Sequence, residues 1–187
     1  MKKITELTVK SFRTVHTKDA NGNRIKSSEP YTRKRTVNTI AQGPRFAHLI
    51  IDGIVFQIIY YIIEYILTLF YSLANNTISI SLTLGLFGLI LTLLSYPAVY
   101  AFFEYKWQKT PAKFLTKTLV IDEYGNKPDL RTIILRSLIR IVPFEPFSCL
   151  SNAEKVSRGW HDRWSNTWVV TDAELAELKR LQQEQSN

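Results

Sequence analysis

The stretch FAHLIIDGIVFQIIYYIIEYILTLF, Phe46–Phe70, has 25 residues, and its only carboxylates are Asp52 and Glu64. A second apolar stretch of 26 residues, Ile78–Phe103, contains no charged side chain. Each is longer than the roughly 20 residues with which a helix crosses the hydrocarbon core of a bilayer. A soluble domain rarely needs two successive helices that are apolar on every side. The sequence therefore predicts two transmembrane helices, over about residues 46–70 and 78–103.

Basic residues are distributed unevenly around these stretches. Residues 1–45 contain 11 Lys and Arg against three Asp and Glu, and residues 104–140 contain eight against four. The connection between the stretches, residues 71–77, has no basic residue. Because Lys and Arg accumulate in the cytoplasmic loops of membrane proteins, both basic flanks are expected in the cytoplasm and the connection outside. This predicts a multi-pass membrane protein with a cytoplasmic N-terminus.

Residues 1–43 form a basic arm ahead of the first apolar stretch. Alternating apolar residues and a turn-rich segment at residues 19–24 predict a loose strand pair or a partly disordered cytoplasmic arm. Beside a membrane helix, contact with anionic lipid headgroups explains the charge more simply than nucleic acid, and no nucleic-acid partner is expected. The apolar stretch begins so late that a retained anchor is expected in place of a cleaved signal peptide. A single cysteine, Cys149, excludes an internal disulfide.

The chain after the second apolar stretch predicts three further elements. Residues 116–130 contain two short segments around Tyr124-Gly-Asn-Lys127 and predict a β-hairpin. Residues 130–150 are apolar but carry several charges, which favours an amphipathic interfacial helix, or a re-entrant helix that breaks at Pro143, over a third span. Thr171 and Glu174 fit a capping box, which predicts a short helix through Leu181 within the C-terminal segment, residues 171–187.

These elements together predict an all-α membrane protein. It has two firm transmembrane helices, an amphipathic or re-entrant third helix and a small cytoplasmic β-hairpin, with the membrane domain over residues 44–170. The second span also carries small residues at steps of three and four, which predict a face for helix packing, as in an oligomer. The alternative is that such residues are simply common in membrane helices. The positions are Ser81, Gly85, Gly88, Thr92 and Ser95.

Three ionisable residues share one side of the first span. Arg45 and Asp52 are two turns apart, and His48 lies on the same side. Asp52 would lie about 10 Å deeper than Arg45, too far for an easy ion pair, so each is expected to have another partner. A buried carboxylate at that depth indicates a functional or pairing role, unless it merely reaches back to the headgroups. His48 and Asp52, four residues apart, could also hold a cation or relay a proton.

A tryptophan-rich segment near the C-terminus provides a possible partner. Residues 158–170 contain three of the four tryptophans together with His161 and Asp162. Because tryptophan favours the membrane boundary, we expect this segment to lie against the cytoplasmic end of the helices, where Asp162 could meet Arg45. The alternative is a soluble strand with incidental charges.

Recognisable catalytic and metal-binding motifs are absent from the sequence. The three histidines, His16, His48 and His161, are scattered, and there is no cysteine cluster, glycine-rich phosphate loop or Gly-x-Ser-x-Gly turn. We therefore expect neither an enzyme nor a bound metal or cofactor.

The order of several short motifs resembles the RDD family of bacterial membrane proteins, named for one arginine and two aspartates. The residues that carry the resemblance, between about Pro44 and Val170, are Arg45-Phe-Ala-His-Leu-Ile-Ile-Asp52, Thr110-Pro-Ala-Lys113, Leu119-Val-Ile-Asp122, Leu135-Arg136, Trp160-His-Asp162-Arg and Thr167-Trp-Val-Val170. The resemblance implies an inner-membrane protein with a charge cluster of Arg45, Asp52 and Asp162. The residues that could support this cluster are His48, Lys113, Arg136, Arg140 and His161. Ala112 and Ser165-Asn166 depart from the family pattern, as does the short, charged third helix.

Two functions remain open at this point. Some RDD proteins are thought to exchange cations for protons, and the charge cluster could support passage of a small cation or proton. Because two or three helices cannot enclose a pathway alone, this function requires an oligomer. The alternative is a membrane scaffold or accessory subunit of a larger membrane complex, in which the cluster joins the C-terminal region to the helices.

Overall fold

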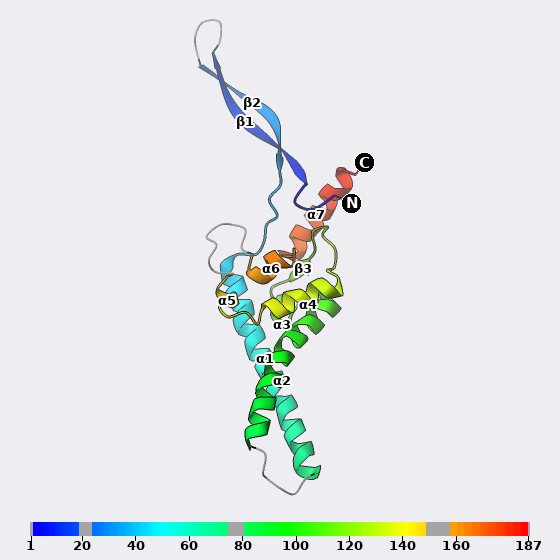
Figure 1. The fold of residues 1–187 in the computed structure, drawn as a ribbon. Helices are drawn as coiled ribbons and strands as arrows, with labels where there is room; N and C mark the ends of the chain where they lie inside the picture. The colour runs from blue at the N-terminus through cyan, green and yellow to red at the C-terminus, as the bar shows by residue number, and fades with distance from the viewer. Residues whose placement is uncertain (1, 19–23, 75–80, 149–157, 187) are drawn as a thin grey trace.

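The computed structural model describes residues 2–18, 24–74, 81–148 and 158–186. Its elements in chain order are β1 (Thr8–Lys18), β2 (Arg24–Lys34), α1 (Gln42–Ala74), α2 (Ser81–Trp107), α3 (Pro111–Leu115), β3 (Thr118–Ile121), α4 (Leu130–Ile139), α5 (Glu145–Ser148), α6 (Trp160–Trp164), β4 (Trp168–Thr171) and α7 (Asp172–Glu184). Two long helices occupy one end of the molecule, and a hairpin projects from the other end (Figure 1). Short helices and a small sheet lie between them.

The long helices α1 and α2 cover the described parts of both apolar stretches. They pack through aromatic rings, with the centroid of Phe56 4.5 Å from that of Tyr100. Within the described residues, α1 alone is long and apolar enough to cross a membrane, over Gln42–Phe70, and 17 % of its most apolar stretch is buried inside the protein. The small-residue face predicted on α2 lies outside the described side chains, apart from Ser95.

The N-terminal arm forms the strand pair that its alternating pattern predicts. β1 and β2 are antiparallel, with Thr8 opposite Lys34 and Lys18 opposite Arg24. The base of the arm enters the main core, because Ile4 and Leu7 are completely buried. The other buried members of this core come mainly from β3, β4 and α7, and they are Val37, Leu119, Ile121, Trp168, Val170, Leu178 and Leu181.

The local hairpin predicted over residues 116–130 is wrong. β3 instead pairs with β4, where Leu119 lies opposite Val170. The predicted turn does form, since Asp122 accepts hydrogen bonds from the N–H groups of Tyr124 and Asn126. The chain then enters α4, because Asp129 caps that helix by accepting from the N–H of Thr132 at 3.0 Å. The strand that pairs with β3 is therefore distant in sequence.

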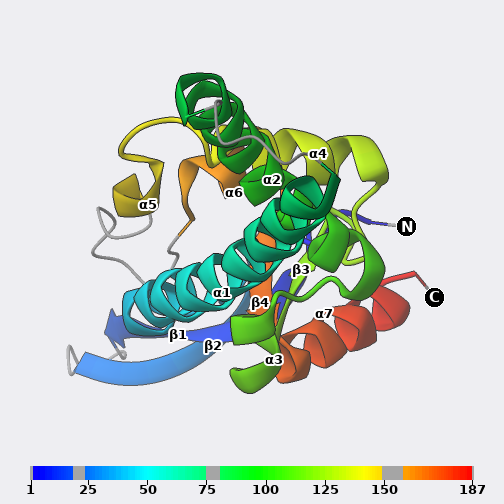
Figure 2. The ribbon, with the colours of Figure 1, turned by 90° about the horizontal axis from the view of Figure 1, so that it is seen from below.

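Residues 130–150 do not form one helix. α4 ends at Ile139 and α5 begins at Glu145, with Pro143 between them and Phe144 at a φ of 66°. The break near Pro143 agrees with the prediction, and residues 149–150 lie outside the described part. α4 lies beside α2, and α6 beside α4 (Figure 2).

Much of the outward surface of α4 is apolar, unlike that of a helix on the surface of a soluble protein. Its arginine face is turned inward, with Arg136 completely buried. Ile133 and Ile139 are buried as well, but four apolar side chains are turned outward and 44–48 % exposed, namely Leu130, Ile134, Leu135 and Leu138.

The C-terminal helix α7 begins where the capping pattern places it. The Thr171 side chain accepts from the N–H of Glu174 at 3.2 Å. The Glu174 side chain does not complete the box, since it pairs with Arg35 on the N-terminal arm at 2.6 Å. α7 continues past the predicted end at Leu181 to Glu184.

Candidate functional site

Asp162 lies within a buried charge cluster between the long helices and the short ones. Its Oδ2 accepts a hydrogen bond from Arg45 Nη1 at 2.5 Å, and its Oδ1 accepts one from Arg136 Nη1. The Asp162 side chain is completely buried. Burial raises the pKa of this carboxyl, but the two guanidinium groups hold it well below its usual range. The expected contact between Asp162 and Arg45 is present, so α6 is joined to α1 and, through Arg136, to α4.

The local sequence explains how α6 presents Asp162. Gly159 is the N-cap of this short helix, and its N–H donates to Asp162 Oδ2 at 3.3 Å. A carboxylate in a first helical turn satisfies backbone N–H groups that have no partner within the helix. Thr167, just after α6, accepts from Arg136 Nη1 at 2.5 Å. The segment expected against the helices is therefore a helix followed by strand β4, and its Asp162 is paired with Arg45 and Arg136.

Glu104, near the end of α2, forms a second centre that the sequence analysis missed. Its Oε1 accepts from Lys113 Nζ at 2.5 Å and from Arg140 Nη2 at 3.2 Å. Its Oε2 accepts from Arg136 Nε at 2.8 Å. The side chain is completely buried. Its position as the first charge after 39 uncharged residues, 65–103, is a signal that could have indicated it.

Asp52 has its partners on α3, and Arg45 is paired elsewhere. Asp52 Oδ2 accepts from Thr110 Oγ1 at 2.6 Å, and Oδ1 accepts from the N–H of Ala112 at 2.9 Å. Asp52 is 2 % exposed, so it does not extend to the surface. The expectation that Arg45 and Asp52 each have another partner is confirmed. Asp52 fixes the turn between α2 and α3 against α1.

The two histidines of the site are held differently. His48 Nε2 and Thr116 Oγ1 are 2.6 Å apart. His161 Nδ1 contacts Glu145, and His161 Nε2 is 3.3 Å from Asp162 Oδ1. Burial and, secondly, the nearby Arg140 lower the pKa of His161 to about 4. The ring is therefore neutral at pH 7, and its Nδ1–H donates to the Glu145 carboxylate.

The cluster is electrically balanced. Burial and the neighbouring arginines lower the pKa of Lys113 to about 8, although Glu104 opposes this, so the lysine is mainly charged at pH 7. The cluster then contains four cations, Arg45, Lys113, Arg136 and Arg140, and four carboxylates, Asp52, Glu104, Glu145 and Asp162. Removing one member of such a buried pair costs about 3–5 kcal/mol, because the other charge is left without compensation.

A cavity of about 50 Å³ lies beside the cluster. All of the predicted site residues line it except Asp162, which pairs with the lining residues Arg45 and Arg136. The lining residues from the cluster are Arg45, His48, Asp52, Lys113, Arg136, Arg140, Glu145 and His161. Among the described residues, no group of three or more His, Cys, Asp and Glu side chains is placed to hold a metal ion.

The comparisons with known proteins agree with the motif pattern. A sequence model of the RDD family matches residues 41–166, more than half of the chain. The chain belongs to the RDD family. The resemblance predicted from the sequence is confirmed, and the match includes Arg45, Asp52 and Asp162. No curated protein and no solved structure matches this RDD protein.

A further polar contact ties the N-terminal arm of this RDD protein to its C-terminal helix. Arg35 forms a bidentate pair with Glu174, at 2.6 and 3.0 Å. The backbone N–H of Asn38 donates to the same carboxylate at 3.0 Å. Burial raises the pKa of Glu174, but these donors more than offset it and the pKa is lowered. The sequence alone did not indicate this pair, because 139 positions separate its members.

Proposed function

We propose that this RDD protein is a membrane-anchored scaffold or accessory subunit, in which the charge cluster holds the extramembrane region on the helices. The observation that carries the proposal is that buried ion pairs and hydrogen bonds connect five elements. Arg45 on α1 binds Asp162 on α6, and Glu104 on α2 binds Lys113 on α3 and Arg136 on α4. Such a network favours one fixed arrangement of the elements over mobile ones.

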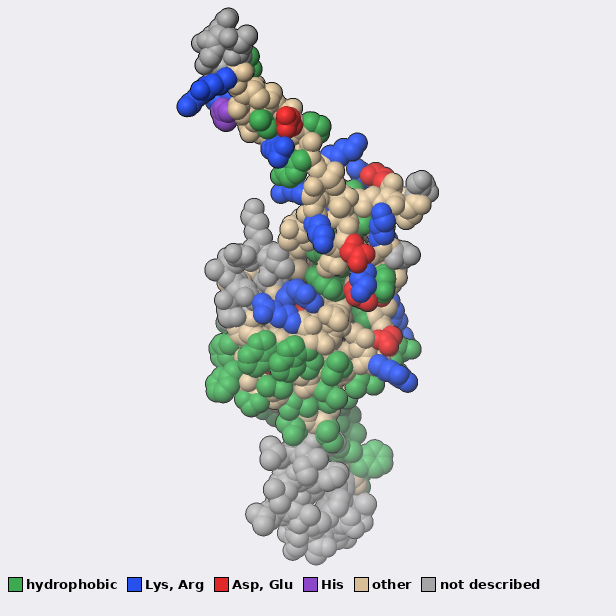
Figure 3. Space-filling view, turned by 45° about the horizontal axis from the view of Figure 1, so that its top comes forward, with side chains coloured by type: hydrophobic (Ala, Val, Ile, Leu, Met, Phe, Trp, Pro, Cys, Tyr) green, Lys and Arg blue, Asp and Glu red, His purple; other side chains and the backbone are tan. Residues whose placement is uncertain are grey.

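The proposed membrane placement uses α1 and α2 as the two spans. The candidate span in α1 and the exposed apolar face of α4 support it. Figure 3 shows a belt of apolar side chains below a level where Lys and Arg gather. Lipid would cover the belt, and headgroups would lie near the basic level. We propose a multi-pass protein of the bacterial inner membrane, with the N-terminus, hairpin and C-terminus in the cytoplasm.

The scaffold function predicts that breaking the charge cluster loosens the C-terminal region from the helices. Asp162→Asn should speed trypsin cleavage in the C-terminal region of the full-length protein in liposomes. Asp172→Asn is the matched control, since that side chain is 54 % exposed and pairs only with Lys109 in the described part. Equal cleavage rates for Asp162→Asn and the control would contradict the proposal.

Passage of a small cation or proton is the second candidate. The cavity beside Asp52 and His48, near the start of α1, favours it. This function would require an oligomer that encloses a pathway. Four Lys and Arg line the cavity against two carboxylates, Asp52 and Glu145, so a cation is disfavoured there. Cation flux in proteoliposomes that Asp52→Asn reduces would support this candidate, and a flux unchanged by Asp52→Asn would reject it.

A further inference from the structure

The charges that face the cavity are not balanced, although the cluster as a whole is. Two of the four carboxylates, Glu104 and Asp162, do not line the cavity. They pair with cations that do line it, which are Arg45, Lys113, Arg136 and Arg140. Asp52 and Glu145 are the lining carboxylates, so the lining has two more cations than carboxylates. An anion fits this field better than a cation.

Two guanidinium groups in the lining have donors that the cluster leaves unused. Arg136 Nη2 and Arg140 Nε are buried and have no hydrogen-bond partner among the described residues. Arg136 is completely buried, and its other nitrogens bind Glu104, Asp162 and Thr167. A buried donor without a partner costs about 1–3 kcal/mol, so a ligand that accepts from it is stabilised. Guanidinium groups match phosphate oxygens especially well.

The size and surroundings of the cavity further limit the kind of ligand that it can bind. A water needs roughly 10–15 Å³ of such volume, so about 50 Å³ holds roughly three to five water-sized groups. A tetrahedral oxyanion has this number of heavy atoms. Phe46, which is 46 % exposed, and Leu49 complete the lining from α1. An apolar edge beside a basic pocket suits the phosphate of a lipid.

We propose that this cavity binds a phosphate group, supplied by an anionic phospholipid headgroup or by free phosphate. Arg140 and Arg136 would donate to its oxygens, and Lys113 and Arg45 would add to the field. The proposal holds whether the protein is a scaffold or a transporter, so the failure of either function leaves it standing.

Binding is measured on the full-length protein in detergent, with two probes. Native mass spectrometry compares retention of phosphatidic acid with that of a phosphate-free glycolipid of the same acyl chains. Equilibrium dialysis with labelled inorganic phosphate tests the free ion. We expect retention of phosphatidic acid over the glycolipid, or saturable binding of inorganic phosphate, and the probe that binds identifies the source.

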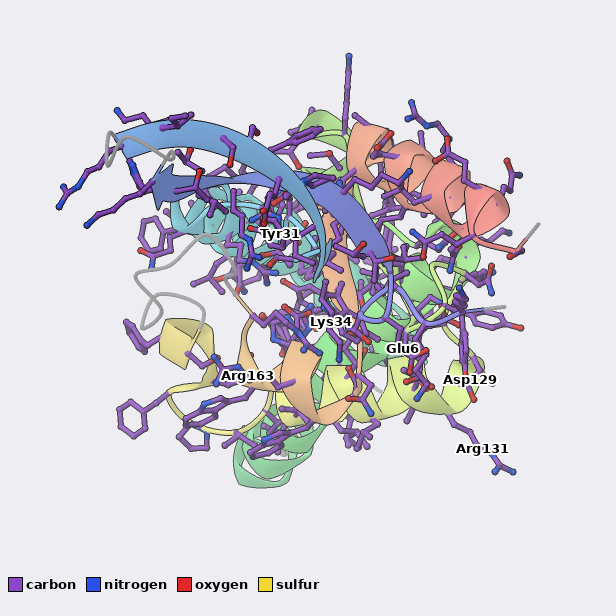
Figure 4. The ribbon with its side chains drawn as sticks, turned by 90° about the horizontal axis from the view of Figure 1, so that it is seen from above. Glu6, Tyr31, Lys34, Asp129, Arg131 and Arg163 are labelled. Atoms are coloured by element: carbon purple, nitrogen blue, oxygen red, sulfur yellow. The ribbon has the colours of Figure 1, made fainter. Side chains whose placement is uncertain are left out.

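Two substitutions that change the charge of the cavity lining in opposite directions test whether the phosphate group binds in the cavity. Arg140→Gln removes one lining cation and should weaken binding by roughly tenfold or more, whereas Glu145→Gln removes a lining carboxylate and should strengthen it by a similar factor. Arg131→Gln is the matched control, because Arg131 lies on the same helix and points away from the molecule (Figure 4). If Arg140→Gln does not fold, Glu145→Gln still tests whether removing a negative charge from the lining strengthens binding. The proposal is overturned if neither probe binds, or if Glu145→Gln does not strengthen binding, or if Arg131→Gln weakens it as much as Arg140→Gln.

Discussion

At the scale of single residues, the site depends on buried charges that are paired with opposite charges. Arg45 and Asp162 are 117 positions apart in the chain, and their side-chain atoms are 2.5 Å apart in the structure. Each charge needs compensation in this environment, since transfer of an unpaired ion out of water costs several kcal/mol. The residues that carry the charge cluster are therefore coupled in stability.

His161 gives the protein a predicted dependence on pH. Its pKa is about 4 in the folded state and 6.5 in the unfolded chain, so the unfolded chain binds a proton first as pH falls. The contribution of neutral His161 to the free energy of unfolding is therefore fully present above pH 6.5, and it is lost as pH falls from 6.5 towards 4. Between pH 7 and 5 the free energy of unfolding should drop by about 2 kcal/mol from this group.

Chemical unfolding of the protein in detergent at several pH values measures this change. His161→Gln should reduce the loss of stability between pH 7 and 5, whereas His16→Gln, on the exposed β1 strand, should leave it unchanged. The same loss in His161→Gln as in the unsubstituted protein would show that His161 does not titrate as described.

The sequence indicated Arg45, Asp52 and Asp162, because charges stand out beside apolar stretches. It also suggested that Asp162 could meet Arg45. It did not indicate Glu104 or Glu145, since a carboxylate at a helix end is ordinary unless its partners are known. Those partners, Lys113, Arg140 and His161, come from other elements and meet only in the folded chain.

At the scale of elements, α4 has the most informative surface. Its Arg136 is completely buried, and Leu138 is 48 % exposed. The sequence predicted the amphipathic pattern of this helix and its break near Pro143. It could not predict which face turns inward, because this depends on Glu104 and Asp162 receiving the arginines. For the same reason the sequence suggested a local hairpin at residues 116–130, although β3 pairs with a strand about 50 residues away.

The exposed apolar side chains of α4 predict that its leucines contact lipid. In a Cys149→Ser background, Leu138→Cys in liposomes should react slowly with a membrane-impermeant maleimide. Arg131→Cys, at the outward-pointing start of the same helix, should react rapidly (Figure 4). The slow reaction should become fast once the liposomes are dissolved in detergent and the protein is unfolded with urea. Comparable rates at the two positions in liposomes would place this face of α4 in water.

At the scale of the whole molecule, the two ends of the chain close one core. Ile4 and Leu7 lie with Leu178 and Leu181 in the same buried cluster. Gln182 Nε2 donates to the backbone oxygen of Lys2 at 2.8 Å, beside this cluster. The alternation and capping patterns predicted the separate strands and the helix. They could not predict that the ends meet, because a pattern in one segment carries no information about a distant partner.

Because both ends of the chain share this core, a cavity made in α7 by substitution should also destabilise the N-terminal arm. Leu178→Ala should lower the free energy of unfolding by about 2–5 kcal/mol, since Leu178 is completely buried. Hydrogen exchange of residues 4–9 should accelerate with it. Lys179→Ala, at an exposed position on the same helix, should change the free energy of unfolding by no more than about 0.5 kcal/mol. It should leave the hydrogen exchange of residues 4–9 unchanged. Faster exchange confined to α7 would contradict the closure.

The most direct test of the charge cluster is a double-mutant cycle between Arg45→Gln and Asp162→Asn. The free energy of unfolding is measured for the unsubstituted protein, each single variant and the double variant, in the same detergent. If the pair joins α6 to α1, each single substitution costs about 3–5 kcal/mol and the double costs less than their sum, by about 1–3 kcal/mol. Additive losses, with no coupling between the two positions, would contradict the account.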